Sequence, residues 1–200
     1  MKHLLIASVA SFFLLTAVHA AGDVEAGKSK SAMCAACHGP DGNSPAPTFP
    51  KLAGQHADYL AKQLAEYKSG ERQDATMNGM AAALSEQDIA DLAAFYASQK
   101  VTLGKAAEDK VAVGQTVYRA GNTATGVSAC AACHSPTGSG NPMANFPSLS
   151  GQHADYTVLQ LKAFRAGERV NDAGSMMRGV AKKMTDAEIE AVAQYIQGLH

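Results

Sequence analysis

Two copies of one pentapeptide hold all four cysteines of this 200-residue chain, and each copy ends in a histidine. Residues 34–38 and residues 130–134 both have the sequence CAACH. Two thiols at this spacing can each add across a vinyl group of one haem and form a thioether bond. The histidine that follows is then held where its ring can bind the iron from one face. The pattern is typical of c-type haem attachment and predicts two covalently bound haem c groups.

The predicted haem-binding residues are two pairs of cysteines and two histidines. The cysteines are predicted to attach the haems, and each histidine is predicted to be the first axial ligand of one iron. They are Cys34, Cys37 and His38 in the first copy and Cys130, Cys133 and His134 in the second. Four cysteines also allow three disulfide pairings, two Cys-x-x-Cys pairs can hold a zinc ion, and one such pair can be a redox centre. None of these alternatives requires a histidine directly after the second cysteine, so haem attachment is favoured.

The first 20 residues have the pattern of a secretory signal peptide. Lys2 gives a positive start, and the run from Leu4 to Val18 is 15 mostly apolar residues long. A membrane-spanning helix needs ~20 apolar residues, and Ala20 is a small residue of the kind that signal peptidase accepts. We therefore predict a signal peptide over residues 1–20 and a soluble protein in the periplasm, with a retained membrane anchor as the alternative.

The composition favours helices and gives no sign of nucleic-acid binding. The chain has no tryptophan and many alanines, and alanine is the best helix former. Without Lys2 there are 16 Lys and Arg residues against 18 Asp and Glu residues, a net charge of −2. Nucleic-acid-binding proteins usually carry a concentrated basic face, so no nucleic-acid partner is predicted.

Most of the chain is one unit written twice. FPKLAGQHADY at residues 49–59 returns as FPSLSGQHADY at residues 146–156, at an offset of 97. LSEQDIADLAAFY at residues 84–96 is matched by MTDAEIEAVAQYI at residues 184–196, at an offset of 100. Such a repeat predicts two structurally equivalent domains in tandem.

We predict these domains at residues 21–103 and 104–200, with a linker near Val101–Asp109. Each domain is expected to be all-α with three helices: one that leads into CAACH, one after Gly-Gln-His and one at the end. The last helix begins with a capping box in both units and has an apolar stripe with the spacing of one buried helix face. The stripe comprises Ile89, Leu92, Ala93 and Tyr96 in the first unit and Ile189, Val192, Ala193 and Ile196 in the second.

The second axial ligand decides what each haem can do. A methionine suits electron transfer, whereas an open position suits gas binding or peroxide chemistry. Aligned on the last helix, Met77 corresponds to Met177, and both are followed by the same glycine spacing, as MNG and MRG. The neighbouring methionines have no methionine as counterpart: Met80 corresponds to Val180, Met176 to Thr76 and Met184 to Leu84. We therefore predict Met77 and Met177 as the ligands, on the loop before the last helix.

His56 and His153 are a rival pair of ligands, since they too occur in both units. They stand where the middle helices begin, only 18 and 19 residues after His38 and His134. This position favours a surface role at the helix start, or a contact with a haem propionate, over iron ligation.

Several stretches of the chain resemble the cytochrome c4 family of dihaem periplasmic c-type cytochromes. They are the two CAACH units, DGNSPAPTFPKLAGQ, NFPSLSGQHADY, NDAGSMMRGVAKKMTDAEI and the closing YIQGLH. The resemblance implies two class I cytochrome c domains related by a pseudo-two-fold axis, with haems close enough for rapid electron exchange. Pro50 and Pro147 lie in P-x-L-x-G stretches that resemble the loop in which a proline carbonyl accepts the second N–H of the iron-bound histidine.

The resemblance also implies a carrier of single electrons that is not an enzyme. Its partners would be redox proteins: an upstream quinol-oxidising complex and a membrane-bound terminal oxidase, with peripheral association at the membrane. Two rival functions are the haem subunit of a flavocytochrome c-type dehydrogenase and a dihaem peroxidase. The peroxidase needs an iron with an open position, whereas both units supply a methionine.

The two predicted domains differ in charge. Residues 21–103 contain 7 Lys and Arg against 10 Asp and Glu, and residues 104–200 contain 9 against 8. Near the predicted methionine ligands, Arg178, Lys182 and Lys183 of the second unit correspond to Asn78, Ala82 and Ala83 of the first. Because a charged patch near an electron port steers a partner of opposite charge, we expect the second haem to serve an acidic partner and the first a more apolar one.

Overall fold

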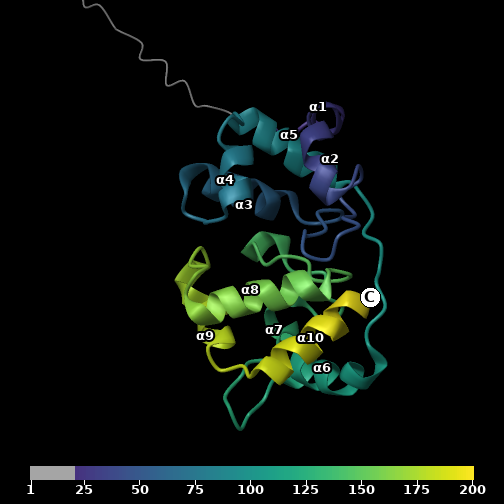
Figure 1. Cartoon of the computed structure of the whole chain (residues 1–200), viewed down its shortest axis with the longest axis vertical. Coiled ribbons are helices and arrows are strands. Elements are labelled where there is room, and N and C mark those ends of the chain that lie inside the picture. The colour runs from purple at the N-terminus through teal and green to yellow at the C-terminus, as the bar shows by residue number, and fades with distance from the viewer. Residues whose placement is uncertain (1–20) are drawn as a thin grey trace, which may run out of the picture.

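A computed structural model describes residues 21–200, so the predicted signal peptide lies outside the described residues. Two helical units lie one above the other along the long axis, and an extended segment joins them along one side (Figure 1). Within residues 21–200 the only strand-like pairings are two isolated antiparallel bridges, Asn122–Val127 and Asn141–Phe146. The predicted all-α fold is confirmed, while the boundary between residues 103 and 104 stays a prediction.

Each unit contains five α-helices where the sequence predicted three. The first unit comprises α1 (Val24–Lys30), α2 (Ala32–His38), α3 (Ala57–Ser69), α4 (Ala75–Ala81) and α5 (Glu86–Ala97). The first predicted helix is divided at Ser31, whose N–H caps α1. The methionine segment, predicted as a loop, is the short helix α4, and the side chain of Asp74 caps its start.

The second unit repeats this order with two additional 3-10 turns. Its helices are α6 (Glu108–Ala120), α7 (Ala131–His134), η1 (Pro142–Ala144), α8 (Ala154–Ala166), η2 (Ala173–Ser175), α9 (Met176–Ala181) and α10 (Asp186–Gly198). No helix within the described part of the chain is long and apolar enough to cross a membrane.

The first and last helices of each unit cross at a glycine. A Cβ atom on Gly27 of α1 would lie 2.0 Å from the carbonyl oxygen of Asp91 in α5. A Cβ atom on Gly114 of α6 would lie 2.2 Å from the carbonyl oxygen of Ala191 in α10. Only glycine permits so close an approach of two helix backbones. The crossing places the capped last helix, with its buried apolar stripe, in the core of each unit.

The crossing in the first unit has a polar clamp that the second unit lacks. Asp91 accepts the backbone N–H of Asp23 at 2.9 Å and the ammonium of Lys30 at 2.7 Å. These hydrogen bonds, the one from Asp23 foremost, lower the pKa of the Asp91 carboxyl to about 2. The counterpart of Asp91 is Ala191, and in the second unit the N–H of Ala107, at the start of α6, donates instead to Gln194 Oε1 of α10 at 3.0 Å.

Reciprocal hydrogen bonds join the two units. Arg72 donates to the hydroxyl of Tyr156 at 3.0 Å, and Arg169 donates to the hydroxyl of Tyr59 at 3.0 Å. Each guanidinium also lies over an aromatic ring of its own unit, at 4.6 Å and 4.5 Å from the ring centroid. Because these hydrogen bonds and ring contacts of Arg72 recur for Arg169 with the units exchanged, this part of the interface follows the predicted pseudo-two-fold axis.

Replacing Gly27 with alanine should weaken the first unit. The added methyl group would force α1 away from α5, and overpacking of this kind costs about 1–3 kcal/mol of unfolding free energy. The measurement is denaturant unfolding of the haem-loaded protein, followed by circular dichroism. Ser29→Ala on the exposed side of α1 is the control and should change the unfolding free energy by less than about 0.5 kcal/mol. Equal unfolding midpoints for the two variants would contradict the close crossing.

Candidate functional site

The CAACH segments end α2 and α7, so both histidines stand at a helix C-terminus. The residues that follow, Gly39 and Ser135, have φ values of 78° and 68° and turn the chain sharply away from the helix. The side chains of His38 and His134 are 7% and 6% exposed. The sharp turn therefore places each predicted iron ligand inside its unit.

Each histidine is oriented by a proline carbonyl. His38 Nδ1 donates to the carbonyl oxygen of Pro50 at 2.9 Å, and His134 Nδ1 donates to that of Pro147 at 2.9 Å. Burial lowers the pKa of both imidazoles, against the opposing effect of the carbonyls. A neutral ring that donates through Nδ1 has its lone pair on Nε2, which is the form that binds a metal ion.

The proline loops are fixed to the rest of each unit by the same backbone bonds. The carbonyl of Gly42 accepts the N–H of Leu52 at 2.7 Å, and the carbonyl of Gly138 accepts that of Leu149 at 2.7 Å. The loop glycine then donates to the last helix: Gly54 to the carbonyl of Tyr96 at 3.0 Å, and Gly151 to that of Ile196 at 3.1 Å. The P-x-L-x-G stretch therefore holds its proline carbonyl at a fixed place relative to the last helix.

The four cysteines are unpaired; Cys130 directly precedes α7, and the other three lie on the same helices as the histidines. Burial raises the pKa of the Cys34 thiol, and it raises that of Cys130 to about 11. The two Cys-x-x-Cys pairs belong to different units, and among residues 21–200 no three His, Cys, Asp or Glu side chains gather in a metal-binding cluster. This arrangement does not provide the single four-cysteine zinc site that the sequence left open.

Met77 and Met177 occupy equivalent positions on α4 and α9, where both side chains are half-buried. The two short helices pack on α3 and α8 respectively. Figure 1 shows α2 and α4 on opposite sides of the first unit, as two ligands that approach one iron from opposite faces require. An aspartate orders both segments: Asp74 accepts the N–H of Met77 at 2.9 Å, and Asp172 accepts that of Arg178 at 2.9 Å.

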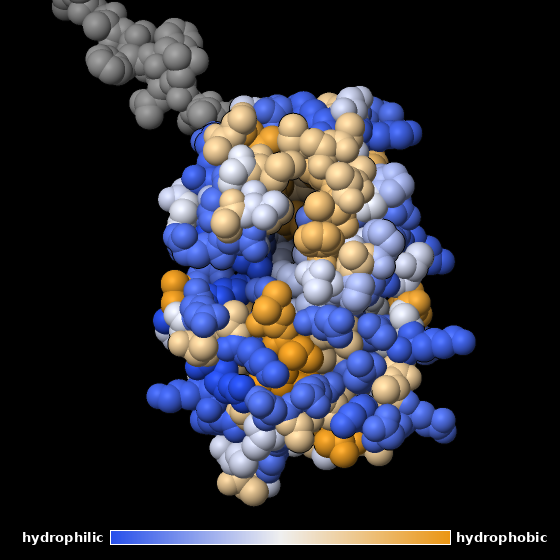
Figure 2. All heavy atoms as spheres, in the orientation of Figure 1, coloured by the Kyte–Doolittle hydropathy of each residue, from blue (hydrophilic) through white to orange (hydrophobic). Residues whose placement is uncertain are grey.

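These residues fit a covalently attached haem in each unit. The imidazoles are buried and correctly oriented, the thiols are available, and aromatic rings of Phe49 and Phe146 lie 6.4 Å and 6.2 Å from the histidine rings. Figure 2 shows a hollow in the first unit that is bordered mainly by hydrophobic residues. When bound, a haem held by histidine and methionine supplies an iron that gains or loses one electron.

His56 and His153 lie at the interface between the units. They precede α3 and α8, as predicted, and both side chains are half-buried, so the structure adds a contact with the opposite unit to the expected position at the helix start. His56 Nε2 donates to the carbonyl of Ser139 at 2.8 Å, and His153 Nε2 donates to that of Ser44 at 2.8 Å. Nε2 of each ring is therefore engaged by the opposite unit, which disfavours iron ligation through that nitrogen.

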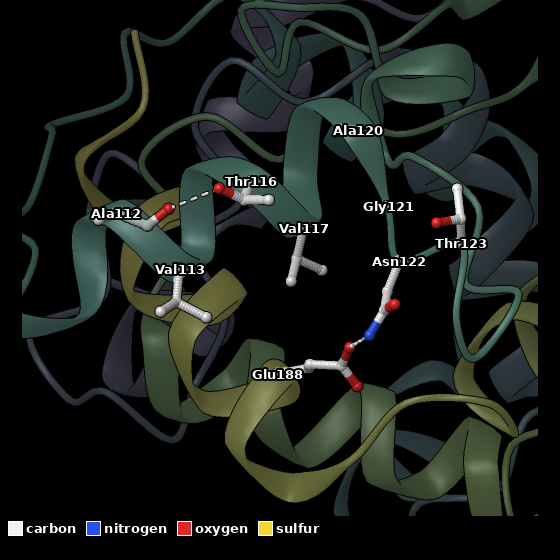
Figure 3. A pocket seen from close by; sticks show the side chains of 9 residues that line it. All are labelled: Ala112, Val113, Thr116, Val117, Ala120, Gly121, Asn122, Thr123 and Glu188. Carbon is white, nitrogen blue, oxygen red and sulfur yellow. Dashed lines mark hydrogen bonds between the residues drawn. The ribbon is translucent and has the colours of Figure 1, made fainter.

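A pocket outside the haem regions lies on the second unit. It is bordered by α6, the start of α10 and the loop after Gly121 (Figure 3). Glu188 accepts a hydrogen bond from Asn122 at 2.7 Å and also belongs to the capping box of α10. The Glu188 carboxylate thus already has structural partners. None of the predicted haem ligands borders this pocket.

Comparisons with known proteins agree with this geometry. The family model for cytochrome c matches residues 24–100 and 111–200. The chain is 49% identical over 201 residues to a cytochrome c4 of Pseudomonas aeruginosa, with 100% of both chains covered. The crystal structure of reduced cytochrome c4 from Pseudomonas stutzeri superposes with a TM-score of 0.88 at 50% identity, over 90% of this chain and 100% of that one.

A further relative is the thiosulfate dehydrogenase electron acceptor of Thiomonas intermedia, which is 40% identical over 84% of this chain and 78% of its own length. Two tandem cytochrome c domains, each with one CAACH helix, define a dihaem c-type cytochrome, an electron carrier with two covalently bound haem c groups. The chain belongs to the cytochrome c4 family, as its sequence motifs indicated.

Proposed function

We propose that this electron carrier works in the periplasm, where it takes electrons from a quinol-oxidising complex and delivers them to a membrane-bound terminal oxidase. The observation that supports carriage without substrate chemistry is the matched pair of methionines. Met77 and Met177 stand on equivalent helices, each packed beside the middle helix of its unit. Two methionine ligands leave no open iron position, which disfavours the peroxidase.

The proposed iron ligands are His38 with Met77 in the first unit and His134 with Met177 in the second. Cys34 and Cys37 would hold the first haem, and Cys130 and Cys133 the second. The chain's part in the reaction is to keep these ligands in place during oxidation and reduction. The proline carbonyls would do this for the histidines, and Asp74 and Asp172, which accept backbone N–H groups of α4 and α9, would do it for the methionines.

Single methionine variants test the ligand assignment. Met77→Ala should open only the first haem and Met177→Ala only the second, because each methionine belongs to one unit. Each change should remove about half of the methionine–iron charge-transfer absorption of the ferric protein and let carbon monoxide bind the affected ferrous haem.

Met80→Leu and Met176→Leu are the matched controls and should leave the spectra nearly unchanged. Loss of the charge-transfer band in Met80→Leu would show that the ligand in the first unit is misassigned. Ready carbon monoxide binding by the unmodified protein would contradict the closed-site carrier and favour the peroxidase.

A second candidate function is the haem subunit of a dehydrogenase. The 40% identity to a thiosulfate dehydrogenase electron acceptor favours this alternative over the peroxidase. Purification of the untagged protein from its own cells distinguishes the two functions. A freely migrating dihaem protein supports the mobile carrier, and a dehydrogenase subunit that co-purifies through successive columns supports the alternative.

We further propose that the second unit carries the electron port for an acidic partner. Of the three cations near Met177, Arg178 forms an ion pair with Asp172 at 2.7 Å, which reduces its value as a steering charge. Lys183 donates to the carbonyl of Gly126 at 3.0 Å and forms no ion pair with any residue from 21 to 200. Lys182 is exposed and has neither an ion pair nor a side-chain hydrogen bond among residues 21–200. The two lysines, rather than all three cations, carry the proposed steering charge.

Charge reversal tests this port. Lys182→Glu and Lys183→Glu should each lower the rate of electron transfer to an acidic partner about threefold or more at low ionic strength, and the rates should converge at high salt. Lys105→Glu makes the same change in net charge within the linker and should have a much smaller effect, since the segment that joins the units runs along the other side of the view from α9 (Figure 1). Equal effects of all three variants would indicate that only net charge matters.

A further inference from the structure

One peptide group in the first unit forms hydrogen bonds at both of its ends. Its carbonyl, which belongs to Pro50, accepts His38 Nδ1–H at 2.9 Å. Its N–H, which belongs to Lys51, donates to Gln152 Oε1 at 2.9 Å. Gln152 lies in the second unit. A continuous chain of hydrogen bonds therefore joins the proposed iron ligand of one unit to a side chain of the other through a single peptide group.

The second unit contains the same arrangement with the roles exchanged. The carbonyl of Pro147 accepts His134 Nδ1–H at 2.9 Å, and the N–H of Ser148, in the same peptide group, donates to Gln55 Oε1 at 2.8 Å. Gln55 and Gln152 are the glutamines of the repeated GQHADY stretch. Two independent copies of this geometry argue against a chance contact.

The orientation of both glutamine amides is fixed by further bonds. Gln152 Oε1 also accepts the N–H of His153 at 3.0 Å, while its Nε2 donates to the carbonyl of Lys51 at 2.9 Å. Gln55 repeats this with His56 at 3.0 Å and Ser148 at 2.9 Å. Because all amide groups have partners of the correct type, the oxygen of each glutamine faces the peptide N–H.

We propose that Gln152 and Gln55 are positioning residues that tune the haem of the opposite unit. Hydrogen bonds at the two ends of a peptide group polarise and strengthen one another. A glutamine that accepts the N–H makes the proline carbonyl a better acceptor, which makes the histidine a stronger electron donor to iron. Stronger electron donation by the histidine favours the ferric state of the haem that it binds. The inference rests on the proposed histidine ligation.

Replacing each glutamine with leucine tests the crossed effect. Gln152→Leu should weaken the Nδ1–H hydrogen bond of His38, and Gln55→Leu should weaken that of His134. The readout is the Nδ1–H proton resonance of each histidine in the ferrous protein, assigned through contacts with its own haem. In each variant the ferrous-to-ferric ratio of the opposite haem at a fixed potential should rise about two- to fourfold.

Tyr156→Phe and Tyr59→Phe are the controls, since each removes one hydrogen bond between the units and leaves the proline peptides untouched. Neither should move a histidine Nδ1–H resonance. The proposal would be overturned if a glutamine variant shifted the histidine Nδ1–H resonance in the unit that carries the substitution, in both units equally, or in neither. A wrong histidine assignment would be recognised separately, because the Nδ1–H resonances of His38 and His134 in the unmodified protein would then show no contact with a haem.

Discussion

The hydrogen bond from the CAACH histidine to a proline carbonyl is the constraint on which the rest of each unit depends. It leaves Nε2 as the ring nitrogen that is free to bind a metal ion, and it requires the proline carbonyl to lie 2.9 Å from Nδ1 of a buried imidazole. Two backbone bonds hold the loop there: its leucine donates to the turn after CAACH, and its glycine donates to the last helix. The last helix in turn reaches its place through a glycine crossing with the first helix. One orienting bond thus sets requirements on three separate elements.

The duplication extends this constraint across the molecule. Polar residues that occur in both copies, such as Gln55 and Gln152 or Arg72 and Arg169, contact the opposite copy, so each unit completes the surroundings of the other. The pairing is nevertheless asymmetric in charge. Glu66 accepts a hydrogen bond from Asn171 at 2.7 Å across the interface, while its counterpart in the second unit is Ala163. The Asp91 clamp and the lysines near Met177 add to this difference, so two similar domains present different surfaces.

The sequence predicted the features that depend on spacing within one unit. The CAACH motif, the apolar stripe of the last helix and the capping boxes follow local rules, and the structure contains the predicted stripe and boxes. It did not predict that α4 and α9 are helical, because the helicity of such short segments depends on packing against the middle helix, and in α4 also on the Asp74 cap. It also did not predict that His56 and His153 each donate a hydrogen bond to the opposite unit. Their repetition in both copies was the available signal, since a polar residue kept at a two-fold related position can contact its opposite unit.

The central claim is that each unit holds one iron between its CAACH histidine and the methionine at the repeat-matched position. A crystal structure of the haem-loaded protein, with the irons located by anomalous scattering, tests it most directly. The account predicts two irons, one between His38 Nε2 and Met77 Sδ and the other between His134 Nε2 and Met177 Sδ. It also predicts that both Nδ1 atoms remain bonded to the carbonyls of Pro50 and Pro147. An iron bound by Met80, Met176, His56 or His153, or one with an open sixth position, would contradict it.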